Sequence, residues 1–394
     1  METFTIDHPA KTAEISVSVF KGNGPGDEYH IMISDSERLD IRDQLGALEE
    51  AYAYALETLR LRDETAVFRR IFASDLANQH EILSKSKLAD SATDRNPVAV
   101  SMVEQPPLPG RRYALWAYHV SDCTSDAKAR FGNSVVIERG ALTHLWSAGL
   151  AAPVVNETRS SFDQTEQLFA AYEAQLGRVG AGLRDNVVRT WLFVQNVDNN
   201  YAGMVEARRE LFEARGLSRE THYIASTGIE GRHANRWCNV LMDAYAVAGI
   251  DEAQIRYLTA GDHLGPTIDY GVTFERGTGI DYRDRRHVLI SGTASIDPSG
   301  NTLHRGDIIA QTERAVKNAA SLLRNAGAAL SDLAHLIVYL RDPADCKLVT
   351  CEIKTHFPTT PTVFLRAPVC RPEWLVEIEC MAIIPADNPD FAPF

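Results

Sequence analysis

The spacing of apolar residues along the chain predicts an order of strands and helices that is repeated. In the C-terminal third, apolar runs predict strands on either side of two segments with helical spacing. The middle of the chain has the same order of elements. In the C-terminal third we expect strands at 287–292, 335–340, 362–368 and 375–384 and helices at 309–326 and 344–356. In the middle we expect strands at 135–140, 142–149, 190–194 and 239–247 and helices from about 163 and at 200–214.

The middle and C-terminal segments share identical residues as well as the same order of elements. The segments beginning at Gln164 and Gln311 align without gaps at a constant offset of 147 residues. An internal duplication explains this better than chance, and repeats of this kind indicate repeated structural units. In the first copy, Gly180 fits a left-handed cap at the end of its helix. The identical pairs are Gln164/Gln311, Thr165/Thr312, Glu166/Glu313, Leu176/Leu323, Gly180/Gly327, Ala181/Ala328, Leu183/Leu330, Asp185/Asp332 and Asp198/Asp345.

A fainter third copy is expected at the N-terminus, with a strand at 29–34, a helix at 39–61 and a strand at 66–72. The alternative is an unrelated α+β domain over residues 1–125. Either way we predict an α/β protein, with mixed sheets that carry helices on one face, built from two or three units. The predicted ranges, each of a common domain size, are 1–125, 134–248 and 264–394.

Composition excludes several functions. The net charge of -13 and the lack of a long basic run disfavour nucleic-acid binding. We find no secretory signal pattern and no apolar run long enough to cross a membrane. The six cysteines form no CxxC pair, and the histidines form no HExxH motif. We therefore expect a cytoplasmic protein with reduced thiols, without a metal or other cofactor.

The stretch VCRPEWLVEIEC, residues 369–380, places two carboxylates on one side of a strand. Glu377 and Glu379 share a face because side chains alternate along a strand, and Val376 and Ile378 take the other. Either this face is solvated, or one carboxylate is held in a pocket. Burial in an apolar wall would raise the pKa of that carboxyl and keep it protonated near neutral pH.

The C-terminal copy resembles the YjgF/Rid family in the segments ISGTASIDPSG, GDIIAQTERAVKNAASLL, AGAALSDL, VYLRD and RPEWLVEIECMAI. The resemblance covers about 120 residues. It implies small proteins that form trimers with clefts between subunits, so several units in one chain imply a fused pseudo-trimer that is a monomer. The arginine of imine-hydrolysing members falls near Pro361, a departure that disfavours imine deamination.

Over the whole chain, the segments ASTGIEG (225–231), FERGTG (274–279) and LRAPVCRPEWLVEIE (365–379) together resemble the chorismatase family of secondary metabolism. The resemblance implies loss of the enolpyruvyl group of chorismate as pyruvate. Gly277 and Cys370 resemble the positions that favour 3-hydroxybenzoate as the second product. A hydrolytic enzyme that leaves a dihydroxycyclohexadiene carboxylate is the first alternative. A Rid-like imine deaminase and a non-catalytic small-molecule binding protein are the others.

These readings predict a set of site residues. An enol ether is cleaved by protonating its methylene carbon, so a protonated carboxyl group suits the step. We expect Glu377 to be the acid, with Glu379 as the second choice, and Cys370 to be a contact to the substrate or a proton relay. Arginines suit the carboxylates of a dianionic substrate. The predicted substrate-binding residues are Arg366, Arg371, Arg276, Gly277, Ser226, Thr227, Gly228, Gly231 and Tyr223.

Overall fold

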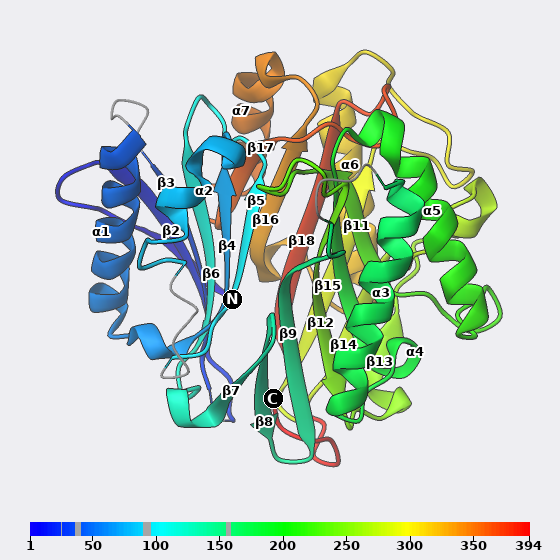
Figure 1. The fold of residues 1–394 in the computed structure, drawn as a ribbon, viewed down its shortest axis with the longest axis horizontal. Coiled ribbons are helices and arrows are strands. Elements are labelled where there is room, and N and C mark those ends of the chain that lie inside the picture. The colour runs from blue at the N-terminus through cyan, green and yellow to red at the C-terminus, as the bar shows by residue number, and fades with distance from the viewer. Residues whose placement is uncertain (25, 36–40, 90–95, 155–158) are drawn as a thin grey trace.

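The fold consists of three repeated units, each a six-stranded mixed sheet with helices on one face (Figure 1). The computed structural model describes residues 1–394 apart from 25, 36–40, 90–95 and 155–158. Within these residues the strand orders are β1-β2-β3-β6-β4-β5, β7-β8-β9-β12-β10-β11 and β13-β14-β15-β18-β16-β17. Read from the edge strand that comes first in the sequence, the three orders are the same. The predicted α/β fold class is therefore confirmed, and the N-terminal region is a third copy.

Unit one contains β1 (Glu2–Ile6), β2 (Ala13–Phe20), β3 (Glu28–Asp35), α1 (Ile41–Leu59), β4 (Ala66–Ala73), α2 (Leu76–Leu83), β5 (Ala99–Glu104) and β6 (Tyr113–Val120). Unit two contains β7 (Lys128–Phe131), β8 (Ser134–Arg139), β9 (Leu142–Ala151), α3 (Ser161–Arg178), α4 (Leu183–Asn186), β10 (Val187–Val194), α5 (Val197–Ala214), β11 (Ala225–Glu230) and β12 (Val240–Ala248). Unit three contains β13 (Ile255–Tyr257), β14 (Gly277–Asp281), β15 (Arg285–Ala294), α6 (Ile308–Asn325), β16 (Leu333–Leu340), α7 (Cys346–His356), β17 (Thr362–Arg366) and β18 (Val376–Pro385).

Local chemistry explains where the long helices begin and end. The side chain of Ser160 accepts a hydrogen bond from the backbone N–H of Asp163 at the start of α3, and Asp307 does the same for Ala310 at the start of α6. Beyond α3, Gly180 has a φ of 70°, so the predicted left-handed cap is confirmed. Of the helix predicted at 39–61, residues 39 and 40 lie outside the described residues.

Several strands were not predicted, among them β1, β2, β11, β14 and the two short strands β7 and β13. β7 and β13 lie at the outer edges of their sheets, between the ranges 1–125, 134–248 and 264–394 that the sequence indicated for the units. They have four and three residues and are only partly buried. A run of three or four residues is too short to show the alternation of apolar and polar side chains that predicts a strand. Such a segment becomes a strand only by pairing with its neighbour in the sheet. No helix within the described ranges is long and apolar enough to cross a membrane.

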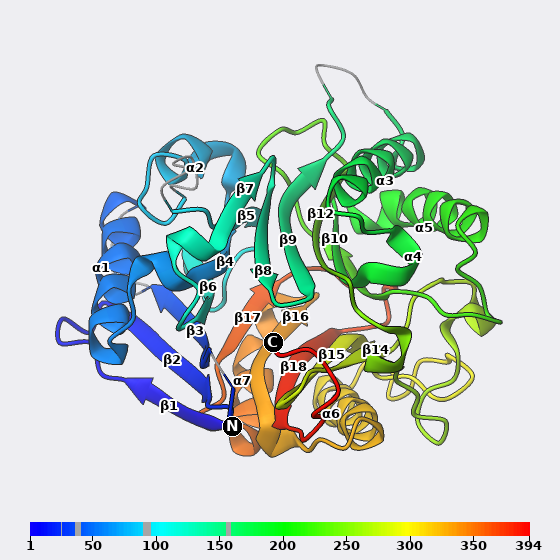
Figure 2. The ribbon, with the colours of Figure 1, turned by 90° about the horizontal axis from the view of Figure 1, so that it is seen from below.

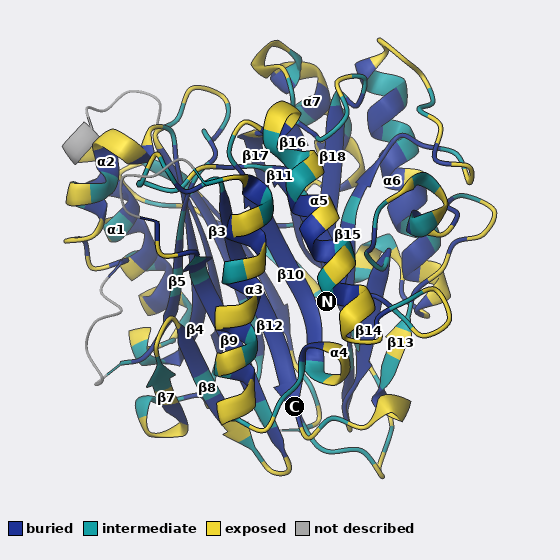
Figure 3. Ribbon diagram, turned by 45° about the vertical axis from the view of Figure 1, so that its right-hand side comes forward, coloured by how far each residue is buried: buried dark blue, intermediate teal, exposed yellow. Residues whose placement is uncertain are grey.

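The three sheets face one another around a common centre, and the helices lie outside (Figure 2). The strands are buried, whereas the outward sides of the helices are exposed (Figure 3). Trp116, Trp146 and Trp191 come from three different strands of units one and two and pack with Phe68 near the centre, each 4 % exposed or less. Burying a large aromatic side chain stabilises a fold by roughly 2–3 kcal/mol. The centre therefore holds the units together mainly by hydrophobic burial.

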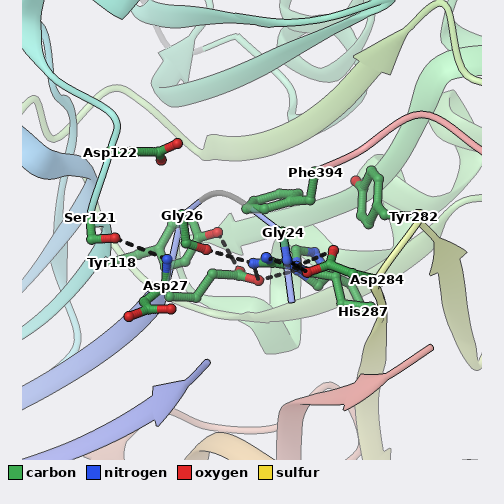
Figure 4. A network of polar contacts seen from close by, with 12 residues as sticks. Gly24, Gly26, Asp27, Tyr118, Ser121, Asp122, Tyr282, Asp284, His287 and Phe394 are labelled. Atoms are coloured by element: carbon green, nitrogen blue, oxygen red, sulfur yellow. Dashed lines mark hydrogen bonds and ion pairs between the residues drawn. The ribbon is translucent and has the colours of Figure 1, made fainter. Parts of the chain in front are cut away.

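A buried polar network also joins units one and three. Glu28 of β3 accepts hydrogen bonds from Arg285 Nη1 (2.7 Å) and Tyr118 Oη (2.6 Å), and its Oε1 lies 2.9 Å from His287 Nε2. Figure 4 shows Tyr118, Asp284 and His287 converging on this network beside the ring of Phe394. Although burial alone would raise it, the pKa of Glu28 is lowered to about 2 by His287, Arg285 and Tyr118 together. The carboxylate is thus held in its charged form.

Replacing Glu28 with Gln should lower the free energy of unfolding at pH 7 by about 3–5 kcal/mol, because Arg285 loses a buried charge partner. The pKa of Glu28 is lower in the folded state, so its contribution is present above about pH 4.5 and disappears as the pH falls toward 2. Urea unfolding at pH 7 and pH 3 measures both effects. Glu2→Gln, which breaks the exposed pair with Lys21, is the control and should cost less than about 1 kcal/mol. Equal losses in the two variants would contradict the network's role.

Candidate active site

A cavity of about 210 Å³ lies between units two and three. Helix α5 and strand β11 supply one wall, while the loops before β14 and β18 supply the other, together with β15 and β18 themselves. Neither unit forms the cavity alone. Its lining residues are Tyr201, Arg208, Ser226, Thr227, Gly228, Tyr270, Val272, Phe274, Arg276, Gly292, Ala294, Ile296, Cys370, Arg371, Trp374 and Glu377.

Glu377 presents its carboxyl group to this cavity from the second position of β18. It is 4 % exposed and pairs across the sheet with Ala294 and Tyr339. A β-bulge in β15 places Gly292 beside it, and a Cβ atom at Gly292 would lie 2.1 Å from Glu377 Oε1. Any side chain there would therefore displace the carboxyl group. The observed position of the Glu377 carboxyl group therefore requires glycine at residue 292.

The surroundings of Glu377 favour its protonated form. Burial is the largest cause and the negative charge of Glu379 is the next, while Arg189 and Arg276 act in the opposite direction. Together they raise the pKa of Glu377 to about 8. A carboxyl group with this pKa holds its proton at neutral pH, as the predicted acid must.

Glu379 has a different environment from Glu377. Its Oε2 accepts a hydrogen bond from Arg189 Nη2 at 2.9 Å, and its Oε1 accepts one from Trp191 Nε1 at 2.9 Å. The Arg189 and Glu379 side chains are each 2 % exposed. Glu379 lies outside the cavity lining, in the interface between β18 and β10. Both oxygens of its carboxylate therefore already accept hydrogen bonds from unit two.

Arg208 lines the cavity and has buried donors that are unused. It is 1 % exposed, and its Nη1 donates a 3.4 Å hydrogen bond to Ser226 Oγ. Among the described residues, its Nε and Nη2 have no hydrogen-bond partner. A buried guanidinium with free donors facing a cavity is suited to binding a carboxylate.

The other two lining arginines are committed to the walls. Arg276 donates from Nε and Nη2 to the carbonyl oxygen of Gly265. Arg371 donates to the carbonyl oxygen of Gly300 and lies over the ring of Trp374. Both guanidinium groups also lie 5.2 Å from the ring centre of Tyr270, which is therefore placed between them. They shape the cavity and give it a positive charge.

The predicted β11 residues fasten the two units at the cavity floor. Thr227 Oγ1 accepts hydrogen bonds from Arg189 (2.6 Å) and from the backbone N–H of Gly292 (2.9 Å). The backbone N–H of Ser226 donates to Ser291 Oγ at 2.9 Å. At Gly228, a Cβ atom would lie 3.1 Å from the ring of Tyr201, so glycine leaves room for that tyrosine.

Cys370 lies at the cavity wall and is hydrogen-bonded to Tyr201 of the neighbouring unit. Burial and the nearby Glu377 raise the pKa of the Cys370 thiol to about 12. The thiol is thus protonated at neutral pH and is poorly suited to act as a nucleophile, which agrees with the expected role of a contact or relay.

Four predicted binding residues do not line the cavity. Arg366 is exposed at the end of the edge strand β17. Gly277 lies within β14, packed against Leu258 and the Leu289 carbonyl oxygen. Gly231 follows β11 and packs against Phe193 and Val103, and Tyr223 is buried on Phe212. Each lies close in sequence to a lining residue, but strand alternation and the sheet edge turn it elsewhere.

The sequence reasoning missed Tyr201, Arg208, Tyr270 and Gly292. Tyr201 and Arg208 lie on the same face of α5, about two turns apart, where they read as ordinary amphipathic helix residues. Only the packing of α5 over unit three gives them a common purpose. Gly292 carried a signal, since it belongs to the segment ISGTASIDPSG that resembles the YjgF/Rid family. Among the described residues, no group of three or more His, Cys, Asp or Glu side chains is placed to hold a metal ion.

Only unit three has a carboxylate at the Glu377 position. The central strands β6, β12 and β18 begin at equivalent residues, and their second positions hold Ala114, Leu241 and Glu377. Ala114 and Leu241 are 1 % exposed or less. The corresponding places in the other two interfaces are therefore filled by apolar packing.

Comparison with known proteins places these features in a family. The family model Endoribonuclease L-PSP matches residues 281–384, within unit three. A RutC family protein of Pyrococcus abyssi is 30% identical over 97 residues, which cover 24% of this chain and 76% of that protein. The chain belongs to the RutC family. The family likeness in sequence is carried by unit three, which also supplies Glu377.

Longer matches cover half of the chain or more. A chorismatase of Streptomyces hygroscopicus is 29% identical over 214 residues, which cover 50% of this chain but only 61% of that protein. A 3-hydroxybenzoate synthase of the same organism is 26% identical over 235 residues, 55% of this chain and 68% of that one. A chorismatase crystal structure matches with a TM-score of 0.61 at 20% identity, over 81% of this chain and 93% of the other. This RutC family chain is thus a relative of chorismatases and shares their fold.

The raised pKa of Glu377 should be visible as a dependence of stability on pH. Its folded pKa of about 8 exceeds the usual value of 4.5, so wild-type stability falls as the pH rises from about 4.5 to 8. Glu377→Gln removes this loss, and its stability relative to wild type should rise by a few kcal/mol over that interval. Urea unfolding at pH 5, 6.5 and 8 measures it. Glu313→Gln, on the solvent side of α6, is the control, and a constant difference for Glu377→Gln would contradict the assignment.

Proposed function

We propose that the protein cleaves chorismate and releases pyruvate, with Glu377 as the acid. The observation that carries the proposal is a buried carboxyl group, with its pKa raised to about 8, in a cavity between two units that three arginines line. Its similarity to chorismatases supports the choice of substrate. The same similarity supports a small-molecule substrate in general, whichever product is formed.

In this mechanism, Glu377 transfers its proton to the methylene carbon of the enolpyruvyl group. The ether carbon then becomes an oxocarbenium ion, and the Glu377 carboxylate left behind stabilises it. Arg208 binds a carboxylate of the substrate through its unused Nε and Nη2 donors. Arg276 and Arg371 add positive charge around the dianion. Thr227 and Gly228 form the floor beneath it.

We propose 3-hydroxybenzoate as the second product, because Cys370 lines the cavity next to Glu377. Chorismate has the composition of pyruvate and 3-hydroxybenzoate combined, so this route takes up no net water. The hydrolytic alternative takes up one water molecule and leaves a diene diol. Gly277, the second residue expected to favour 3-hydroxybenzoate, lies outside the cavity lining and supports neither route.

We also propose that the chain acts as a monomer, since its three units already cover one another's interfaces (Figure 2). The domain ranges drawn from the sequence, 1–125, 134–248 and 264–394, are retained as a proposal with β7 and β13 assigned to the units they pair with.

Purified protein given chorismate should release pyruvate, detected with a coupled dehydrogenase, and 3-hydroxybenzoate, detected by mass spectrometry. Glu377→Gln should lower kcat by about 10²–10⁴-fold, because it cannot donate the proton. A second product heavier by one water molecule would assign the hydrolytic route. Ammonia from an imine substrate, without pyruvate from chorismate, would move the protein to the deaminases. Binding without turnover of either would make it a binding protein.

Replacing Arg208 with Gln should weaken the transition-state complex by about 2 kcal/mol or more, since a buried charged partner of the substrate is lost. This corresponds to a loss of roughly 30-fold in kcat/KM. Arg209→Gln makes the same change one residue along α5, outside the cavity lining, and should leave kcat/KM near that of wild type. Equal effects at the two positions would show that Arg208 does not bind the substrate.

A further inference from the structure

The carboxylate nearest to Glu377 along its strand is held by the neighbouring unit. Arg189 and Trp191 lie on β10 of unit two, and both donate to Glu379 on β18 of unit three, each at 2.9 Å. A buried carboxylate that accepts two hydrogen bonds, one of them from a guanidinium, is stabilised as an anion. Unit two thereby fixes a negative charge two residues from the proposed acid.

Glu377 itself is given no such partner. Among the described residues it forms no ion pair, although three buried arginines lie around it. Arg189 is bound to Glu379 and Thr227, and Arg276 is bound to the carbonyl oxygen of Gly265. The two carboxyl groups on this face of β18 therefore have different surroundings. The interface with unit two stabilises Glu379 as an anion and leaves Glu377 without a counter-ion.

We propose that Glu379 is a positioning residue whose fixed charge, held by Arg189 and Trp191, keeps Glu377 in the protonated form from which it donates. This inference rests on the proposed function and deepens it, because it names a group that keeps the proposed acid, Glu377, protonated. Like charges on neighbouring carboxyl groups cannot both persist in a buried site, so fixing one favours a proton on the other.

The remaining groups around Glu377 do not overturn this division. Burial and Glu379 favour the acid form, and they outweigh Arg189 and Arg276. The hydroxyl and thiol groups stay neutral near pH 7, because burial raises the pKa of each. Arg208 is directed to the cavity at its far wall. The charged and titratable groups that face the acid are Glu379 from β18, Arg189 from β10, Tyr339 from β16, Tyr201 and Arg208 from α5, Arg276 from the loop before β14, and Cys370 from the loop before β18.

A second buried ion pair, Arg70–Asp243, serves as a control that distinguishes the proposed role of Glu379 from a purely structural one. Asp243 occupies on β12 the position that Glu379 occupies on β18, and it pairs with Arg70 of β4 at 2.7 Å, both side chains fully buried. The residue two places before Asp243 is Leu241, so no acid is present there to be influenced. The Arg70–Asp243 pair therefore joins units one and two in the same way without the proposed effect.

Infrared difference spectroscopy of the free protein between pH 5 and 9 tests the proposal without any substrate. The carboxyl C=O band that Glu377→Gln abolishes reports the protonation of Glu377. Glu379→Gln should move the midpoint of this band downward by about one pH unit or more, whereas Asp243→Asn should leave it in place. An unchanged midpoint in Glu379→Gln, or equal shifts in the two variants, would overturn the proposal.

Arg189→Gln provides a second test should Glu379→Gln not fold. Without the guanidinium the charge on Glu379 is no longer fixed, so the two carboxyl groups should share the proton, and the Glu377 band should lose intensity at pH 7. An unchanged absorbance would show that Arg189 does not hold the charge. If chorismate is turned over, the decline of kcat/KM at high pH should also move to lower pH in Glu379→Gln and not in Asp243→Asn. Failure of turnover in the wild type would refute the proposed reaction and leave the infrared result to decide the coupling.

Discussion

Each sheet of this protein has helices on only one of its faces, so the opposite face must be buried against something else. The inner faces of three sheets bury one another, and this mutual burial is the constraint on which the rest of the structure depends (Figure 2). It brings strands from distant parts of the sequence into contact. It also makes every polar group at the centre a buried group, which must then be paired across units.

The candidate site follows from that constraint. Its acid comes from unit three, its free guanidinium from unit two, and its floor from the strand that joins them. Glu28, between units one and three, and Glu379, between units two and three, are each paired with a buried arginine, while Glu377 has no ion pair among the described residues. Burial by itself would favour the neutral form of Glu28 and of Glu377. The placement of Arg285 and Arg189 is what makes their chemistry differ.

Having all three units in a single chain allows their interfaces to diverge. A true trimer would repeat the same acid in each of its clefts. Here the equivalent positions hold Ala114, Leu241 and Glu377, so this position carries a buried apolar side chain in two interfaces and a carboxyl group that lines a cavity in the third. The retained Arg70–Asp243 pair shows that the ionic tie between central strands does not require an acid beside it.

The sequence alone determined the repeat, the α/β class and the strand that carries Glu377, because these depend on local periodicity and on residues that recur at a constant offset. It also pointed to Ser226, Thr227, Gly228 and Cys370, which lie in the motifs ASTGIEG and LRAPVCRPEWLVEIE and line the cavity. Only the tertiary structure decided that Glu377 and not Glu379 faces the cavity, that Arg208 has free donors, and that Arg366 is remote. The physical reason is that ionisation and access are set by partners in another unit, and no spacing along one strand records which partner it will meet.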